Sequence, residues 1–360
     1  MKAAILHAFG TPLALETLPD PQPGAGEVVV DVVAAPVLSY AAEVYSGARQ
    51  YPMLLPLAVG TGAVGRVRAV GPDATRLAPG DWVLCDPIVR ARDAAVAPDS
   101  MLQGLIAPSP GAQRLQAHFR HGSFAEQQLL PLENAVPLGA IAAADASRWC
   151  ALSAALVPYG GLLAAGLQAG ETVLISGATG HFGSVGVAVA LAMGAACVVA
   201  PGRNQAALAE LVRRYGARVV PVELTGDEQA DQQRMREAAP GLIDKVLDIL
   251  PPLPDASPVQ AAVGTVRPGG TVVLMGGQRG SLALNYMHLM RHGITVRGQY
   301  MYPRKAPAQL MALVRAGLLP LDTLQVTSFP LDQANEAVAH AATSNTPFHY
   351  TVIEPGKARE

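Results

Sequence analysis

Two hydrophobic patterns divide the chain near residue 150. Before that point, short β-rich runs such as Val28–Val33, Gly65–Val70 and Trp82–Cys85 alternate with turns rich in glycine and proline. Asp86–His121 is a long stretch with several prolines and no regular period, which predicts a protruding loop or a contact surface. From Trp149 onward the pattern changes to strands that alternate with helices.

Six β-rich runs with helical patterns between them follow Trp149. The predicted strands are Thr172–Ser176, Cys197–Ala200, Arg218–Val222, Lys245–Ile249, Thr271–Met275 and Ile294–Arg297. The clearest predicted helices are Gly183–Met193, Gln205–Tyr215, Pro307–Ala316 and Leu331–Ala342, with a last strand at Tyr350–Ile353. This alternation predicts an α/β fold with a doubly wound, six-stranded parallel sheet of the dinucleotide-binding type.

Residues 172–202 contain no Asp, Glu, Lys or Arg, which is long enough to suggest a membrane span. The hydrophobic pattern within this segment changes twice, however, from a β-branched run to a helix of small residues and back again. A buried strand–loop–helix–strand unit has the same hydropathy, because parallel strands are covered on both faces. We therefore expect no membrane partner.

Composition excludes several classes of protein. The 360 residues are 50% hydrophobic and 15% charged, with a formal net charge of −2, so neither disorder nor a nucleic-acid-binding surface is expected. Length predicts at least two domains. Cys85, Cys150 and Cys197 are odd in number and far apart, which indicates a reducing compartment rather than a disulfide framework. With no signal-peptide pattern at the N-terminus, we expect a cytoplasmic protein.

A glycine-rich loop, GATGHFG, joins the first strand of the second pattern to its helix. Glycine at 180 allows the backbone to approach a pyrophosphate, and glycine at 183 allows close packing of the helix. A glycine-rich contact between helix and sheet, without a ligand, is the alternative interpretation. The candidate cofactor-binding residues of this loop are Gly177, Thr179, Gly180, His181, Phe182 and Gly183.

The second strand of this pattern ends in Gly202-Arg203-Asn204, with no acid to bind the adenosine ribose. Without a carboxylate, a 2′-phosphate is not repelled, and Arg203 can pair with it. These three residues are therefore candidate cofactor-binding residues, and NADP(H) is favoured over NAD(H). The alternative is that Arg203 is a solvated residue at a helix start.

Metal and hydrolase motifs are missing. His118 and His121 lack a third ligand nearby, and the pair His288 and His292 has Leu289 where a zinc peptidase would have Glu. No GxSxG or P-loop motif occurs.

The motifs VGRVRAVG, APGDWV, GSFAEQ, AGETVLISGATGHFG and VRPGGTVVLMGG occur in this order. Their order and spacing resemble the medium-chain dehydrogenase/reductase superfamily over essentially the whole chain. The resemblance implies a GroES-like catalytic domain at residues 1–150 and 300–360, and a Rossmann nucleotide-binding domain at 151–299. It also implies a homodimer paired through Gly293–Arg297 (GITVR).

Zinc enzymes of that superfamily have ligands where this chain has Leu38, Thr61 and Gly62, and four cysteines in the lobe that matches Asp86–His121. Since none of these donors is present, we expect no bound metal. The segments YP, LP and GT around Tyr51 are more similar to the zinc-independent NADPH:quinone oxidoreductases. This sequence departs from that pattern in three places. It has two extra residues before Tyr51, Leu38-Ser39 in place of Asn-Pro, and His181-Phe182 in place of Gly-Val.

The resemblance places four polar residues at the mouth of the substrate cleft, with Tyr51 as the expected proton donor. These candidate catalytic residues are Tyr51, Tyr40, Ser39 and Thr61. Tyr40 is alternatively a helix-start residue, and Tyr51 a loop anchor beside a proline. Met275 and Gly276 match the backbone that faces the nicotinamide carboxamide, although a strand-ending turn explains them equally well.

Three functions remain open from the sequence. The leading hypothesis is an NADPH-dependent, zinc-independent oxidoreductase that reduces a quinone or an α,β-unsaturated carbonyl, with a small-molecule substrate. The second is a zinc-free alcohol or carbonyl oxidoreductase of secondary metabolism. The third is a non-catalytic NADPH-binding protein.

Overall fold

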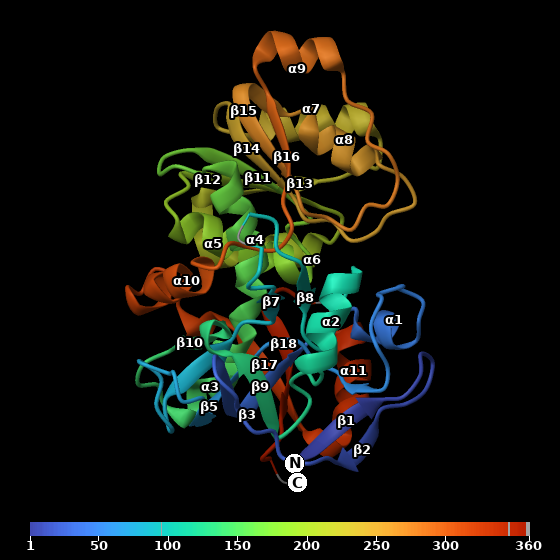
Figure 1. Cartoon of the computed structure of the whole chain (residues 1–360). Coiled ribbons are helices and arrows are strands. Elements are labelled where there is room, and N and C mark those ends of the chain that lie inside the picture. The colour runs from blue at the N-terminus through green and yellow to red at the C-terminus, as the bar shows by residue number, and fades with distance from the viewer. Residues whose placement is uncertain (95, 345, 358–360) are drawn as a thin grey trace. The chain divides into compact units, whose positions relative to one another are not determined.

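The computed structural model describes residues 1–94, 96–344 and 346–357, and these residues form two compact units (Figure 1). Unit 1 contains Met1–Ser153 and the described parts of 321–345 and 349–360, and unit 2 contains Ala154–Pro320 and Thr346–Phe348. Unit 2 therefore extends to Pro320 rather than to residue 299. Residues just past 299 pack closely on this unit, because a Cβ atom on Gly160 would lie 2.4 Å from the Met301 carbonyl oxygen and 2.7 Å from the Tyr302 side chain.

Unit 1 is built on a seven-stranded, mainly antiparallel sheet in which β10-β6-β5-β3-β18-β17 are neighbours and β9 also pairs with β3. Its strands are β3 (Glu27–Val37), β5 (Ala63–Val70), β6 (Trp82–Cys85), β9 (Gln127–Pro131), β10 (Ala135–Pro137), β17 (Gln325–Pro330) and β18 (His349–Glu354). A smaller sheet contains β1 (Lys2–Leu6), β2 (Ala14–Thr17) and β4 (Leu57–Ala58). Helices α1 (Ala41–Tyr45), α3 (Ala146–Ala151) and α11 (Ala334–Thr343) also belong to the unit.

The expectation that Asp86–His121 has no regular secondary structure is wrong. The segment forms an antiparallel pair, β7 (Ile88–Arg90) with β8 (Ser100–Leu102), and the helix α2 (Pro110–His118). Ser109 caps α2 by accepting a hydrogen bond from the Ala112 amide at 3.1 Å. A local core encloses the buried side chains of Val89, Met101, Ala107, Ala112 and Phe119. Strands of three residues are too short to produce a readable period, so the sequence pattern did not reveal them.

Unit 2 has a parallel six-stranded sheet in the order β13-β12-β11-β14-β15-β16, the doubly wound arrangement predicted from the strand–helix alternation. The strands are β11 (Thr172–Ser176), β12 (Cys197–Gly202), β13 (Val219–Glu223), β14 (Ile243–Asp248), β15 (Val266–Leu274) and β16 (Thr295–Gly298). The helices are α4 (Ser153–Ala165), α5 (His181–Ala192), α6 (Gln205–Tyr215), α7 (Glu228–Ala238), α8 (Ser257–Val263), α9 (Tyr286–His292) and α10 (Ala306–Arg315). The predicted fold class, a GroES-like unit with a Rossmann sheet, is confirmed.

One face of this sheet is covered by α7 and α8, which pack against each other (Figure 1). Met235 of α7 and Val259 of α8 belong to the same buried cluster as Leu174, Val246 and Val272 of the strands. Because successive parallel strands connect by right-handed crossovers, α5 and α6 lie on the opposite face. The strand order reverses between β11 and β14, so their carboxyl ends border the position where such sheets bind dinucleotides.

The charge-free segment 172–202 is the strand β11, the glycine loop, α5 and the strand β12. Both strands are buried along their whole length, and so is most of the helix between them. Among the described residues, no helix combines the length and the apolar character that crossing a bilayer would require.

Candidate nucleotide site and tyrosine cluster

The glycine loop makes a tight turn between β11 and α5. Gly177 has a φ of +93°, a conformation that favours glycine, and its carbonyl oxygen accepts a hydrogen bond from the Gly180 amide at 2.9 Å. Gly180 is the N-cap of α5 and has no side chain to satisfy the first amides of the helix. The start of α5 therefore presents backbone N–H groups and the positive end of the helix dipole, which suit a phosphate.

Glycine is required at two further positions because the backbone segments touch. A Cβ atom on Gly183 would lie 1.9 Å from the Gly177 carbonyl oxygen, and one on Gly202 would lie 2.5 Å from Cγ2 of Thr179. The first helical turn is thus pressed against the loop, and Thr179 packs against the end of β12. The loop conformation depends on both contacts.

His181 and Phe182 occupy the first turn of α5 with their rings 4.9 Å apart in an edge-to-face arrangement. Burial lowers the pKa of His181 to about 4, so the imidazole is neutral at pH 7. A neutral ring is compatible with the positive helix terminus, whereas a charged ring would be repelled by it.

At the end of β12, Arg203 is exposed and makes no ion pair with any residue that the structure describes. Its guanidinium is therefore available to a ligand. The Asn204 side chain is already in use, because its Oδ1 accepts a hydrogen bond from the Ala207 amide at 3.1 Å as the N-cap of α6. The predicted cofactor role of Asn204 is consequently limited to its amide nitrogen and backbone.

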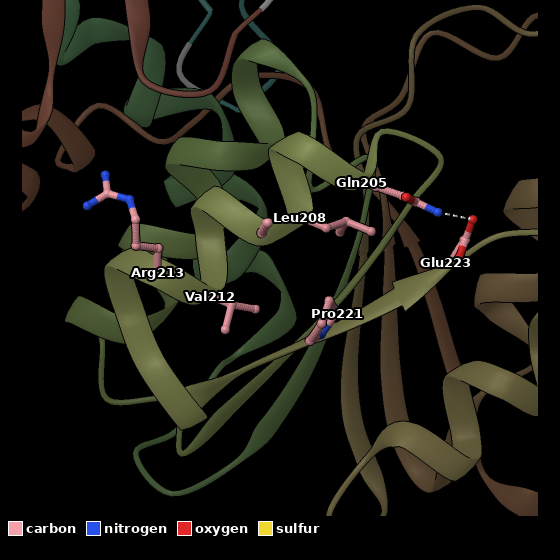
Figure 2. A pocket seen from close by; sticks show the side chains of 7 residues that line it. Gln205, Leu208, Val212, Arg213, Pro221 and Glu223 are labelled. Atoms are coloured by element: carbon pink, nitrogen blue, oxygen red, sulfur yellow. Dashed lines mark hydrogen bonds between the residues drawn. The ribbon is translucent and has the colours of Figure 1, made fainter.

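A surface pocket lies between α6 and β13, and Figure 2 shows the side chains that line it. Its volume is about 600 Å³, and none of its lining residues belongs to the glycine loop. At one end, Gln205 donates a hydrogen bond to Glu223 at 2.6 Å. Glu223 on β13 is the register partner of Gly202 on β12, the residue just before Arg203. This acid was not among the residues predicted from the sequence.

The turn after β15 contains Met275 and Gly276 and is tied to the end of β14. The Met275 amide donates to the Asp248 carbonyl oxygen at 2.9 Å, and a Cβ on Gly276 would lie 2.4 Å from Asp248 Oδ2. Asp248, which is only 2% exposed, is not among the residues predicted from the sequence. An acid that ends a buried hydrophobic strand, as in Val246-Leu247-Asp248, is the signal that could have identified it.

Two candidate catalytic residues of unit 1 are brought together around an arginine. Tyr40, the N-cap of α1, and Tyr51 have ring centroids 6.3 Å apart. The Arg49 guanidinium lies 4.0 Å from the Tyr40 centroid and 5.3 Å from that of Tyr51. Arg49 is 15% exposed, and its ion pair with Glu43 is long, at 3.9 Å. Arg49 is not among the residues predicted from the sequence, because a lone arginine in a loop belongs to no motif.

The other two candidates, Ser39 and Thr61, are half-buried. Ser39 directly precedes Tyr40. Thr61 follows Gly60, whose backbone hydrogen-bonds the buried Tyr45 at the end of α1, and this contact links the two segments. The Thr61 hydroxyl oxygen is buried and has no hydrogen-bond partner among the described residues, so it can receive or donate a bond to a ligand.

Histidines and cysteines do not gather. Within the part of the chain that the structure describes, no group of three or more His, Cys, Asp or Glu side chains could hold a metal ion. His118 pairs instead with Glu27, and the rings of His288 and His292 lie tilted against each other with centroids 4.4 Å apart.

Two family models match the chain. Residues 24–140 match an alcohol dehydrogenase GroES-like domain, and residues 182–316 match a zinc-binding dehydrogenase domain. Together they cover the main parts of the two units.

Similar proteins extend over nearly the whole chain. An alcohol dehydrogenase of Moraxella sp. (strain TAE123) is 30% identical over 93% of this chain and 94% of its own length. A cobalt- and zinc-bound thermostable alcohol dehydrogenase from Pyrobaculum aerophilum is 25% identical, with a TM-score of 0.76 over 99% of both chains. A protein from Sinorhizobium meliloti 1021, described as a zinc-binding dehydrogenase and solved with NADP, has a TM-score of 0.77 at 20% identity over 98% of this chain and 99% of its own.

Proposed function

The chain belongs to the medium-chain dehydrogenase/reductase superfamily and is an oxidoreductase of that group, and from this premise we propose that it reduces a quinone or an α,β-unsaturated carbonyl with NADPH and without zinc. The observation that carries the proposal is the kind of polar side chain that unit 1 provides. Non-ligating residues stand at the expected zinc positions, while two phenols and a guanidinium form a cluster nearby in the sequence.

The residues present do not fit a catalytic zinc ion. The resemblance puts the ligand positions at Leu38, Thr61 and Gly62, which supply no thiolate, imidazole or carboxylate. Burial raises the pKa of the Cys85 and Cys150 thiols, which opposes the thiolate that zinc requires. No step of the proposed reaction therefore involves a metal.

The residues of unit 2 do fit a nicotinamide dinucleotide. When bound, NADPH supplies the hydride, and the protein contributes orientation and charge. The amides at the start of α5 bind the pyrophosphate, and Arg203 binds the 2′-phosphate through charge-assisted hydrogen bonds. This role of Arg203 supports NADP(H) over NAD(H).

In unit 1, the Tyr40–Arg49–Tyr51 cluster supplies a proton and positive charge. A carbonyl that accepts hydride develops negative charge on its oxygen, and a fixed guanidinium stabilises that charge. Tyr51 can donate its hydroxyl proton to the product, as general acids do. Stacking on both rings holds the Arg49 guanidinium in place without a close carboxylate partner.

The test is a panel of quinone, enone, aldehyde and ketone acceptors, monitored by NADPH absorbance with and without a chelator. We expect turnover with an enone or a quinone, no effect of the chelator, and no zinc by elemental analysis. About one zinc per chain after dialysis, or loss of activity with chelator, would refute the zinc-independent reaction.

Tyr51→Phe should slow the reduction of an enone by about 10²–10⁴ and leave NADPH affinity unchanged, because only a proton donor is lost. An enone is the right substrate, since its α-carbon must be protonated after hydride delivery. Tyr40→Phe is the matched control, because Tyr40 contacts the same guanidinium. An inactive Tyr40→Phe beside an active Tyr51→Phe would assign the acid to Tyr40.

A second candidate function is the oxidation of an alcohol or the reduction of a simple carbonyl. The alcohol dehydrogenase of Moraxella favours it, since that relative matches across both units. Product analysis separates the two candidates, because this reaction yields an alcohol rather than a hydroquinone or a saturated ketone. NADPH binding without turnover on the whole panel would instead support a non-catalytic dinucleotide-binding protein.

We also propose that the protein is a cytoplasmic homodimer. Its three cysteines are buried and unpaired, which suits a reducing compartment. β16 pairs only with β15 among the described strands, and Tyr286 and Met290 of the preceding α9 are 76% and 55% exposed. A second copy that pairs with this edge would remove the exposed strand and cover the apolar side chains.

A further inference from the structure

A buried carboxyl group lies at the carboxyl edge of the sheet in unit 2. Asp248 ends β14, the strand beside the reversal of strand order. It is in register with Ser176, the last residue of β11, and with Leu274, the last residue of β15. The next residues on those two strands are Gly177 of the glycine loop and Met275 of the turn after β15. Asp248 therefore lies between the two backbone segments of the candidate nucleotide site.

Hydrogen bonds connect the Asp248 carboxylate to both segments. It accepts bonds from the Ser176 hydroxyl, from the Gly276 backbone and from the Leu250 amide, the last at 3.5 Å. The main chain reinforces these contacts, because the Ile249 amide donates to the Ser176 carbonyl oxygen at 3.1 Å. Three donors from three segments thus converge on one side chain.

No opposite charge compensates for this burial. The groups that face the carboxyl from β11 and from the turn after β15 are a hydroxyl and backbone amides, and none of them is titratable in this range. Tyr159 of α4 and His181 of α5, the titratable groups on the adjoining helices, do not affect its pKa, and no described charged side chain does. Burial consequently raises the pKa of Asp248 to about 6.

We propose that Asp248 is a positioning residue for the dinucleotide, whose ionised carboxylate holds Ser176 and Gly276 and thereby fixes the glycine loop relative to the turn after β15. The inference rests on the proposed binding of NADP(H) by unit 2. An ionised carboxylate can accept from all three donors, whereas the protonated form must redirect one oxygen to donate. Cofactor affinity should therefore decrease as the pH falls through about 6.

A merely structural hydrogen bond would behave differently. Because the folded pKa of Asp248 is raised above its ordinary 3.8, ionisation opposes folding, and this destabilisation is absent below pH 3.8 and complete above about pH 6. Asp248→Asn removes it, so the Tm of the variant relative to the wild type should rise between pH 4 and pH 8. Loss of affinity without a matching loss of stability at pH 8 marks a positioning role.

The experiment measures NADPH affinity by titration calorimetry between pH 5 and pH 8 for four proteins. These are the wild type, Asp248→Asn, Ser176→Ala and the control Asp244→Asn. Asp244 lies at the opposite end of β14, where it accepts a bond from the Thr172 amide at 2.8 Å and pairs with Arg267. We expect the wild type to bind several-fold more weakly at pH 5 than at pH 8. Asp248→Asn should bind about tenfold more weakly at pH 8 with a flat profile, and Asp244→Asn should keep the wild-type profile.

Hydrogen exchange on the ligand-free proteins separates this inference from the proposed function. Asp248→Asn should accelerate amide exchange at residues 177–180 and 275–277, and Ser176→Ala should accelerate it in the first segment. Wild-type affinity and pH profile in Asp248→Asn, or unchanged exchange, would overturn the inference. If the wild type binds no NADPH, the proposed function fails and the exchange result alone decides whether Asp248 holds the loop. If Asp248→Asn does not fold, Ser176→Ala carries both measurements.

Discussion

Substitution of Gly183 by alanine tests the geometry of the glycine loop most directly. The added methyl group would lie 1.9 Å from the Gly177 carbonyl oxygen, 2.5 Å from its carbonyl carbon and 2.9 Å from the Ala178 Cα. All three are backbone atoms, so no side chain can rotate away. The first turn of α5 and the loop must separate by about 1 Å.

The size of the effect follows from two opposing contributions. Overpacking of this kind costs about 1–3 kcal/mol, and the better helix propensity of alanine returns up to about 1 kcal/mol. A net loss of about 1–2 kcal/mol lowers the Tm of a unit of this size by roughly 2–8 °C. The larger effect is on ligand binding, because a displacement of about 1 Å in a positioning loop can reduce function about a hundredfold.

The assay combines thermal unfolding with calorimetric titration of NADPH, and Gly186→Ala is the matched control on the same helix. A Cβ on Gly186 would lie 3.0 Å from the Pro158 side chain and would touch no backbone of the loop. Gly186→Ala should therefore bind NADPH within about threefold of the wild type, whereas Gly183→Ala should bind at least tenfold more weakly. Equal affinity for the two variants would refute the view that the loop binds the pyrophosphate in this conformation.

Three further predictions concern charge, pH and assembly. Arg203→Ala should weaken NADPH binding by about ten- to a hundredfold and leave NADH affinity unchanged, because one charge-assisted contact is lost. Competition by 2′-AMP measures this loss, and Glu223→Gln is the control that removes the nearby acid. The pKa of His181 is lowered from 6.5 to about 4, so the unfolded chain binds a proton that the folded chain does not, and stability falls as the pH drops from 6.5 to 4. His181→Gln should recover up to about 2 kcal/mol at pH 5, by urea unfolding, and nothing at pH 8; an equal change at both pH values would contradict the assignment. Light scattering at micromolar concentration should give the mass of two chains, and a monomer mass would exclude pairing through β16.

The alternation of strands and helices in unit 2 could be read from the sequence because each element there is long and buried on a regular pattern. The run TVLIS coincides with β11, and QAALAELVRRY coincides with α6. The glycine loop was also predictable, because its backbone requires glycine: Gly177 has a positive φ, and Gly183 packs closely against the loop. Local backbone geometry restricts which residue types can occur at a position, so it can be predicted from a single segment of the sequence.

Contacts between distant segments could not be predicted from the sequence in this way. The pairing of Asp248 with Ser176, and the placement of Arg49 over Tyr40 and Tyr51, depend on side chains that approach only after the sheet or loop has formed. The hairpin and helix within Asp86–His121 were hidden for a related reason, because elements this short are stabilised by a shared core around Phe119 and not by their own periodicity. The amino-acid sequence by itself determined the alternation of strands and helices in unit 2 and the position of the glycine loop. Only the tertiary structure decided which carboxyl group is buried beside that loop and which cation contacts both tyrosine rings, because burial and proximity are properties of the packed chain.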